Sequence, residues 1–313
     1  MTPPAGAKTP RPDFRGMMPV MPTPITESGD IDEASQRRLV QYCLKCGAVA
    51  VGHLGGASEF YKVGDKDRRR LIEIVVDEVA GRVPVYIGVT ATAFRIAVDY
   101  AKEAEALGAD MLMAGSPYMD VPDRDGMFEY YRGLSDAVSI PIIIQDTAVS
   151  SGVLTADVMW QLYQECGNIR YAKVEGQRFL AKMGELLELS GGAMQIIGGA
   201  GGRHLIHMLR AGVTAYMTGT EALDIHGAVV SAYLAGDEET AARIYFEQLL
   251  PYLMFYQEYP RELLKGMLRD RGVMDCAHVI PPAKVEPMSV LERREFDWVL
   301  ERIGFNKRWP DIP

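Results

Sequence analysis

The sequence has no apolar run long enough to cross a membrane, because a membrane-spanning helix needs about 20 consecutive apolar residues. Residues 1–13 are rich in Pro, Ala and Thr and lack the apolar core of a secretory signal, so we expect a flexible tail there. Basic residues are in the minority: 33 Lys and Arg against 42 Asp and Glu give a net charge of −9. With no long basic run, we expect binding neither to nucleic acid nor to an anionic membrane surface.

Cysteine is also scarce. The four cysteines in 313 residues do not form the disulfide framework of a small secreted protein. Cys43 and Cys46 have C-x-x-C spacing, but they lie in an apparent amphipathic helix and no second pair follows to complete a zinc site. The histidines do not cluster with carboxylates at metal-ligand spacing. We therefore expect a protein of the reducing cytoplasm that uses no metal and no cofactor.

Short apolar runs alternate with helical patterns along most of the chain. The runs are almost wholly apolar, as in PVYIGV at 84–89, which is typical of parallel strands buried on both faces. No G-x-G-x-x-G loop follows the first run, which argues against an open doubly wound nucleotide-binding sheet. The sequence thus predicts an α/β fold, a (β/α)8 TIM barrel over residues 14–232. Its strands are predicted at 17–22, 49–54, 84–89, 110–114, 141–145, 170–174, 195–198 and 214–218.

Apolar residues spaced by three and four predict helices between the strands, at 32–46, 69–79, 93–107, 127–137 and 155–166. Thr155 is the predicted N-cap of the last of these. From residue 233 to residue 313 the strand pattern stops, and helices are predicted at 237–255, 260–271 and 289–303. We expect an all-helical appendage, with its aromatic residues, Tyr256 among them, packed in its core.

Lys173 is the most informative residue at the carboxyl ends of the predicted strands, where the active sites of such barrels lie. A lysine inside a short buried strand is costly unless it faces a polar cavity. Burial of an amine favours its uncharged form, which is the nucleophile of imine chemistry with a ketone. The alternative is a lysine held in a structural ion pair with Glu175.

Glu175 lies two residues beyond Lys173, so the alternation of a strand places both side chains on one side. A carboxylate beside an imine-forming lysine can move protons at the neighbouring carbon. Tyr118 and Ser58 are candidates for proton relay or carboxylate binding. His53 could act as a base, but a single histidine on a strand is more often a hydrogen-bonded packing residue.

Several segments of the chain together resemble the dihydrodipicolinate synthase and N-acetylneuraminate lyase superfamily of Schiff-base aldolases, over about residues 14–303. The resemblance implies that Lys173 forms the imine and that the protein is a homotetramer whose helical region completes each subunit. The segments that carry the resemblance are Pro19–Pro24, Gly55–Glu59, Ala80–Val85, Ser116–Tyr118, Pro141–Ile144 and the strand that contains Lys173.

The departures from this pattern argue against dihydrodipicolinate synthase activity. Gly56 and Ala57 stand where the family has a hydroxyl pair that binds the keto-acid carboxylate, so Ser58 and the backbone N–H groups of residues 56–58 are the expected substitutes. Gln145 replaces a relay tyrosine. Ser150 stands where the synthase has an arginine for a second carboxylate, and Met119 replaces a second tyrosine.

The pattern of Ser58-Glu59, Ile144-Gln145-Asp146 and Lys173-Val174-Glu175 is similar to the 2-keto-3-deoxy-sugar-acid dehydratases, particularly those acting on 2-keto-3-deoxyarabonate. The resemblance implies an imine at Lys173, with Glu175 as the base and Tyr118 or a water assisting. The alternatives are retro-aldol cleavage that releases pyruvate and a catalytically silent barrel that binds a keto acid. Substrate contacts are expected from Gly56, Ala57, Ser58, Gln145, Asp146, Gly199 and Thr218.

Overall fold

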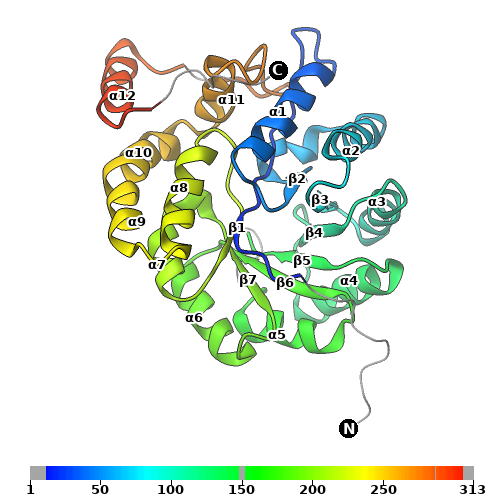
Figure 1. Ribbon diagram of the computed structural model, residues 1–313. Helices are drawn as coiled ribbons and strands as arrows, with labels where there is room; N and C mark the ends of the chain where they lie inside the picture. Colours follow the sequence, from blue (N-terminus) through cyan, green and yellow to red (C-terminus); the bar gives the residue numbers. More distant parts are fainter. Residues whose placement is uncertain (1–11, 148–151, 286, 306–313) are drawn as a thin grey trace.

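The structure is a computed structural model that describes residues 12–147, 152–285 and 287–305 (Figure 1). Most of the expected tail at 1–13 and the position of Ser150 lie outside the described residues. A single parallel sheet occupies the centre of the molecule, and helices surround it.

Every predicted strand position carries a strand of this sheet. The strand order is β1-β8-β7-β6-β5-β4-β3-β2, and all seven neighbouring pairs are parallel. β1 ends sooner than expected, before Pro19, which has no N–H to donate. The strands are β1 (Gly16–Met17), β2 (Val51–His53), β3 (Val85–Gly88), β4 (Met111–Gly115), β5 (Ile142–Gln145), β6 (Ile169–Val174), β7 (Gln195–Gly198) and β8 (Ala215–Tyr216).

The sheet curls until its two end strands approach each other. The segment after β1 forms a parallel bridge from Val20 to Gly52 of β2. The Gly52 N–H donates to the Pro19 carbonyl at 2.9 Å, and the Met21 N–H donates to the Gly52 carbonyl at 2.8 Å. These bonds protect the polar backbone edges that an open sheet would leave exposed.

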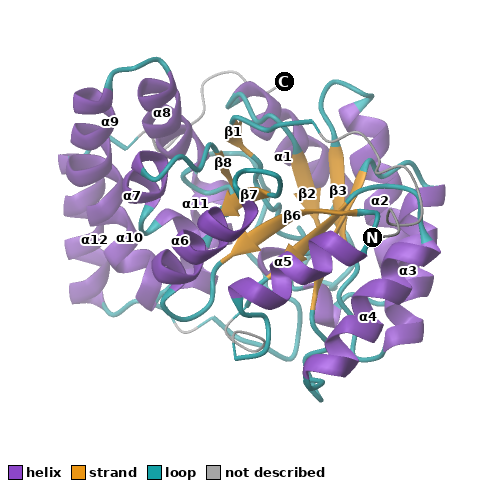
Figure 2. Cartoon of the chain, turned by 90° about the horizontal axis from the view of Figure 1, so that it is seen from below, coloured by secondary structure: helices purple, strands orange, loops and turns teal. Residues whose placement is uncertain are grey.

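Helices alternate with the strands and form the outer layer (Figure 2). The five helices expected between strands are present, whereas α6, α7 and α8 were not predicted from the sequence. Thr155 occupies the N-cap position of α5, but its hydroxyl donates to the Asp157 carboxylate and does not cap the helix. The helices are α1 (Glu33–Lys45), α2 (Asp65–Val79), α3 (Phe94–Ala106), α4 (Arg124–Ala137), α5 (Ala156–Glu165), α6 (Phe179–Ser190), α7 (Leu205–Arg210) and α8 (Leu223–Leu234).

Four further helices follow α8, and no strand lies between them in the part of the chain that the structure describes. They are α9 (Glu238–Ile244), α10 (Leu250–Glu258), α11 (Pro260–Asp270) and α12 (Val290–Arg302). A π-helical turn, Tyr245–Leu249, divides the single helix expected at 237–255. Within the described ranges, no helix combines the length and apolar character that crossing a bilayer requires.

Arg271 lies just after α11 and connects this helical region to the part of the chain that contains the strands. Its side chain is buried, donates to the Tyr42 hydroxyl at 2.8 Å and pairs with Asp224 at 3.0 Å. The guanidinium also lies over the Phe305 ring, 4.1 Å from its centroid. Three elements distant in sequence therefore converge on one buried cation.

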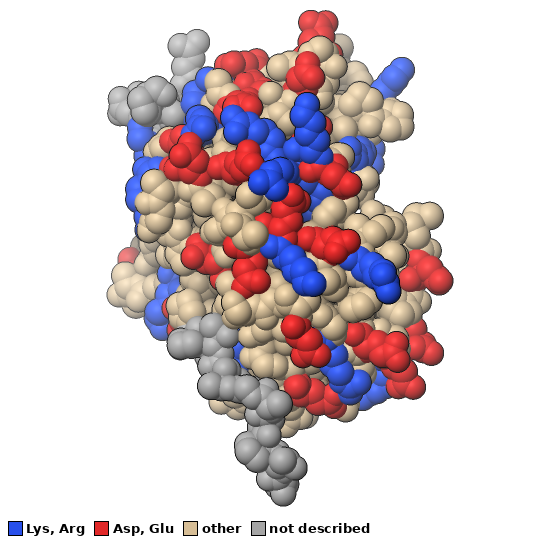
Figure 3. Space-filling view, turned by 90° about the vertical axis from the view of Figure 1, so that its right-hand side faces the viewer, with Lys and Arg blue, Asp and Glu red and all other residues tan. Residues whose placement is uncertain are grey.

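Two apolar cores support the sheet. The larger fills the space between the strands and the helices. The smaller lies inside the curl of the sheet and includes Met18, Met113, Tyr171 and Ile197. On the face shown in Figure 3, acidic and basic side chains are interleaved. Surface ion pairs such as Arg69–Glu103 join side chains of opposite charge. The net negative charge is therefore not gathered into one acidic patch on that face.

Candidate active site

Lys173 and Glu175 meet at the carboxyl end of β6. Lys173 is 6% exposed, and its Nζ lies 2.8 Å from Oε2 of Glu175. Gln145, at the end of β5, is the register partner of Lys173. Because alternate residues of a strand share a side, the two-residue spacing predicted this meeting. This contact is compatible with both interpretations of Lys173, the imine-forming lysine and the structural ion pair.

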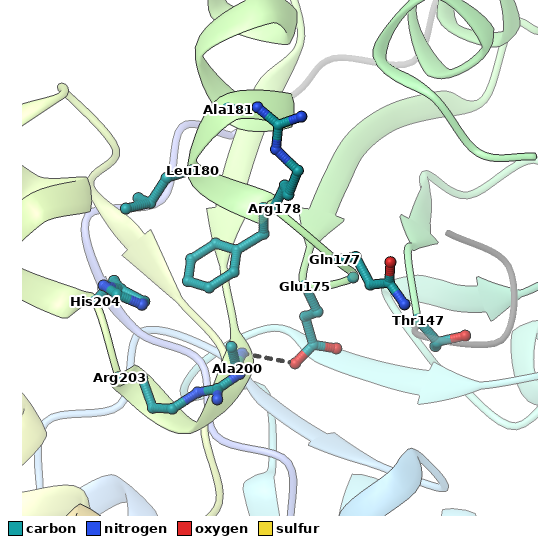
Figure 4. Close-up of a pocket in the computed structure, with 11 residues that line it drawn as sticks. Thr147, Glu175, Gln177, Arg178, Leu180, Ala181, Ala200, Arg203 and His204 are labelled. Atoms are coloured by element: carbon teal, nitrogen blue, oxygen red, sulfur yellow. Dashed lines mark hydrogen bonds between the residues drawn. The ribbon is translucent and has the colours of Figure 1, made fainter. Parts of the chain in front are cut away.

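A backbone contact fixes the other oxygen of Glu175. Its Oε1 accepts a hydrogen bond from the Ala200 N–H at 2.8 Å, the dashed line in Figure 4. Gly199 makes room for this arrangement, because a Cβ built on it would lie 2.5 Å from the Glu175 Cγ. The carboxylate is thus held with one oxygen on the loop after β7 and the other on the lysine.

The pair opens onto a cavity of about 340 Å³ at the carboxyl ends of the strands. Its wall includes six of the residues expected at the site: Gly56, Ala57, Gln145, Lys173, Glu175 and Thr218. The helical region closes the opposite side with Tyr256, Arg261 and Lys265. A more open hollow of about 840 Å³ lies on the other side of Glu175, where Arg178, Arg203 and His204 line it (Figure 4).

Other residues expected at the site have different neighbours. The Ser58 hydroxyl is buried, donates to the Met21 carbonyl at 2.5 Å and accepts from the Gly55 N–H at 3.2 Å. The Tyr118 ring packs edge-on against Phe60, at a centroid distance of 5.7 Å, and does not line the cavity.

Asp146 lies behind the wall of the 340 Å³ cavity and is fully buried. Its Oδ2 pairs with Lys182 at 2.9 Å and accepts from the Gly176 N–H at 3.1 Å. Burial raises the pKa of Asp146 above its ordinary value, although Lys182 opposes this. These contacts tie α6 to the loop after β6, next to Glu175.

His53 is a packing residue, as its position on a strand indicated. It is fully buried, its Nδ1 accepts from the Leu54 N–H at 2.8 Å, and its Nε2 is 3.1 Å from Gln36 Oε1. Burial lowers its pKa to about 3. A neutral ring that donates to Gln36 satisfies both contacts, and His53 does not line the cavity.

The cavity residues from the helical region were not predicted from the sequence. Lys265 is 1% exposed and contacts Glu59 Oε1 at 2.8 Å and the His278 carbonyl at 2.7 Å. Burial lowers the pKa of Lys265, and Glu59 acts against this. Burial would raise the pKa of Glu59, but Lys265 and Lys62 outweigh it and hold the pKa below its ordinary value. A lone lysine in an amphipathic helix gave no signal of this role.

The fold and the site together define the class of protein. An amine paired with a fixed carboxylate, in a cavity at the ends of parallel strands, contains the groups that imine chemistry on a keto compound uses. The model of the dihydrodipicolinate synthetase family matches residues 13–302, and the chain belongs to that family. Members of the family are lyases, and this chain is an enzyme of the lyase class.

Relatives of different activities are similar to the chain. An L-2-keto-3-deoxyarabonate dehydratase from Azospirillum brasilense is 32% identical over 277 residues, which cover 86% of this chain and 87% of the relative. A 4-hydroxy-tetrahydrodipicolinate synthase from Bradyrhizobium diazoefficiens is 29% identical over 296 residues, covering 89% and 96% respectively.

Solved structures share the fold. A prophage protein of the dihydrodipicolinic acid synthase family from E. coli K12, in complex with pyruvate, superposes with a TM-score of 0.85 at 22% identity and covers 94% of this chain and 99% of that one. A dihydrodipicolinate synthase from Acinetobacter baumannii, also complexed with pyruvate, has a TM-score of 0.83 at 22% identity, with 94% and 100% covered.

Proposed function

We propose that this lyase dehydrates a 2-keto-3-deoxy sugar acid, of the 2-keto-3-deoxyarabonate type, through an imine on Lys173. The observation that carries the proposal is the 2.8 Å contact between Lys173 Nζ and Glu175 Oε2 at the cavity wall. The similarity to the Azospirillum dehydratase supports the choice of substrate. The proposal also takes the curled sheet, with its bridge from Val20 to Gly52, as a closed (β/α)8 barrel over residues 14–232.

The chemistry follows from the pair. Glu175 accepts a proton from the Lys173 ammonium, and the free amine attacks the C2 ketone. Glu175 then gives this proton to the hydroxyl of the carbinolamine, which leaves as water, so that Glu175 is ionised again. The resulting iminium withdraws electrons and acidifies the C3 protons, one of which Glu175 removes. The enamine then expels the C4 hydroxyl as water, and hydrolysis of the imine frees the lysine. Retro-aldol cleavage would instead break the C3–C4 bond and release pyruvate.

The substrate carboxylate is assigned to the wall formed by Gly56 and Ala57. Their N–H groups begin a short 3-10 turn, Gly56–Ser58, and the first N–H groups of a turn have no partner within it. Ser58 supports this turn through its hydroxyl bonds to Met21 and Gly55. Attraction of the anion is therefore local to Lys173 and this turn and does not come from the net charge, which is negative.

A borohydride trapping experiment tests the imine. The wild-type protein is incubated with pyruvate, reduced and weighed; we expect one covalent adduct per chain. Lys173→Arg keeps the positive charge but cannot form the imine, so it should give no adduct. An adduct in Lys173→Arg, or none in the wild type, would contradict the proposal.

A product assay tests the reaction type. With a panel of 2-keto-3-deoxy sugar acids, we expect dehydrated products and no stoichiometric pyruvate. Pyruvate release would favour the retro-aldol alternative. Glu175→Gln should still be trapped by borohydride but should lose turnover by at least about 100-fold, because general-base catalysis contributes on that scale.

The oligomeric state is a further part of the proposal. We propose a homotetramer, which the resemblance implies. Sedimentation equilibrium measures the mass of the assembly, and a monomer at micromolar concentration would overturn this part.

A further inference from the structure

The proposed elimination needs a group that gives a proton to the departing C4 hydroxyl. Lys173 is occupied as the imine, and Glu175 holds the proton taken from C3. Gln145, at the end of β5, has no proton to give at neutral pH. Either Glu175 returns this proton to the hydroxyl, or another side chain of the cavity supplies one; normal turnover without that second group would assign the step to Glu175.

Most of the remaining polar groups of the cavity already form ion pairs or hydrogen bonds, or cannot donate a proton. Glu59 and Lys265 hold each other at 2.8 Å, and Glu59 also binds Lys62. Arg261 does not lose its proton in proteins. Tyr61 is 51% exposed, and the Lys62 Nζ lies 5.6 Å from its ring centroid. The Thr218 hydroxyl donates to the Gly219 carbonyl at 2.9 Å, so Tyr256 is the group that remains.

Tyr256 reaches the cavity from α10, in the helical region. It is partly buried, and its ring lies 3.7 Å from the position of a Cβ on Gly201 and 6.0 Å from the ring of Tyr252. Its hydroxyl has no hydrogen-bond partner among the described residues. Burial raises its pKa well above the ordinary value, and the Glu221 and Glu175 carboxylates raise it further. The phenol is therefore protonated at neutral pH.

Glu221 is a buried carboxyl behind the same wall. It is 1% exposed, its Oε2 has no hydrogen-bond partner within the described ranges, and it packs against Gly219, which lines the cavity. Burial raises the pKa of Glu221 to about 7. Arg271, Tyr252 and Tyr256 interact electrostatically with it, and the Arg271 cation favours its ionised form.

We propose that Tyr256 is the catalytic acid that protonates the leaving C4 hydroxyl, and that neutral Glu221 is a positioning residue that keeps this phenol able to donate. The inference rests on the proposed dehydration. As the enamine electrons re-form the C2=N bond, the C3=C4 bond forms and the C4–O bond breaks. The oxygen leaves as water with the phenol proton, and the phenolate recovers a proton from solvent. No electrons are lost or gained.

Glu221 acts through its charge. An ionised carboxylate near the phenol would raise the pKa of Tyr256 and weaken it as an acid, whereas a neutral carboxyl does not. The acid role therefore predicts that kcat falls as the pH rises through about 7, where Glu221 ionises.

The first test compares two tyrosines of one helix. Tyr256→Phe should lower kcat on the sugar acid by about 100-fold or more while changing KM little. Tyr252→Phe removes a buried hydroxyl from the same helix and should retain the wild-type rate. A 4-chloro analogue of the substrate needs no proton on its leaving group, so Tyr256→Phe should process it within a few-fold of wild type.

A second measurement separates this role from the chemistry at Lys173. Both the wild type and Tyr256→Phe should exchange the methyl protons of pyruvate with deuterium, followed by proton NMR, because that exchange needs only the imine and Glu175. No exchange in the wild type would refute the proposed function itself. Normal turnover by Tyr256→Phe, loss of its exchange, or an equal defect on the chloro analogue would each refute the acid role alone.

The pH profile tests Glu221. Glu221→Gln is neutral at every pH and should remove the decline of kcat above pH 7 that the wild type shows. A profile that keeps its decline in Glu221→Gln would show that Glu221 does not tune the phenol.

Discussion

A Cβ atom on Gly199 would lie 2.5 Å from Cγ and 2.6 Å from Oε1 of Glu175, closer than nonbonded atoms approach. Gly199 has a φ of −137°, which is not in the left-handed region, so we infer the constraint from the space that a side chain would need. The absence of a side chain at Gly199 therefore determines where the Glu175 carboxylate can lie.

Gly199→Ala should consequently displace Glu175 from Lys173. We expect kcat/KM to fall by about 100-fold, because small displacements of reacting groups cost that much, and the free energy of unfolding to fall by about 1–3 kcal/mol from overpacking. Steady-state kinetics and urea unfolding measure the two effects.

Gly184→Ala is the matched control. Gly184 lies within α6, and a Cβ there meets no atom within 4 Å. We expect an unchanged rate and a stability gain of about 0.5–1 kcal/mol, since alanine is the better helix residue. A Gly199→Ala enzyme as active as Gly184→Ala would contradict the steric account.

The buried Asp146–Lys182 pair should be structural. Lys182→Met leaves Asp146 buried without its cation and should lower the free energy of unfolding by about 3–5 kcal/mol. Asp146→Asn combined with Lys182→Met removes the uncompensated charge and should recover part of the loss. Urea unfolding of the single and double variants gives the coupling energy. Additive losses would mean that the two groups do not depend on each other.

His53 should make stability depend on pH. Its pKa is about 3 in the folded chain and about 6.5 when unfolded, so its stabilising contribution is complete above pH 6.5 and declines as the pH falls toward 3. Between pH 6 and 4 the contribution to the slope is about 1.4 kcal/mol per pH unit. His53→Asn should lack this part of the slope. Unfolding curves across that range measure it, and equal slopes in the two proteins would exclude His53 as the source.

Arg271 should matter more than an exposed cation. Arg271→Met removes the contacts with Tyr42, Asp224 and the Phe305 ring and should destabilise the protein by about 3 kcal/mol. The control is Arg210→Met, because the pair of Arg210 with Glu238 is exposed and contributes at most about 1 kcal/mol. Thermal or urea unfolding compares them, and similar losses would argue against Arg271 as an anchor.

The sequence by itself determined the strand positions and the meeting of Lys173 with Glu175. Both depend on local regularities: apolar runs form buried strands, and residues two apart on a strand share a side. The same reasoning identified His53 as a packing residue. The spacing of apolar residues was less regular in α6 to α8, and these helices were therefore not predicted.

Only the tertiary structure decided what surrounds the pair. Tyr256 and Lys265 lie more than 80 residues after Lys173 in the sequence, and no local period reveals that α10 and α11 close the cavity. The Ser58 hydroxyl and the Asp146 carboxylate come from the expected segments, but backbone carbonyls, N–H groups and Lys182 already bind them. A polar side chain can bind a substrate only if no other group of the protein already binds it. Which groups lie next to it depends on the path of the whole chain.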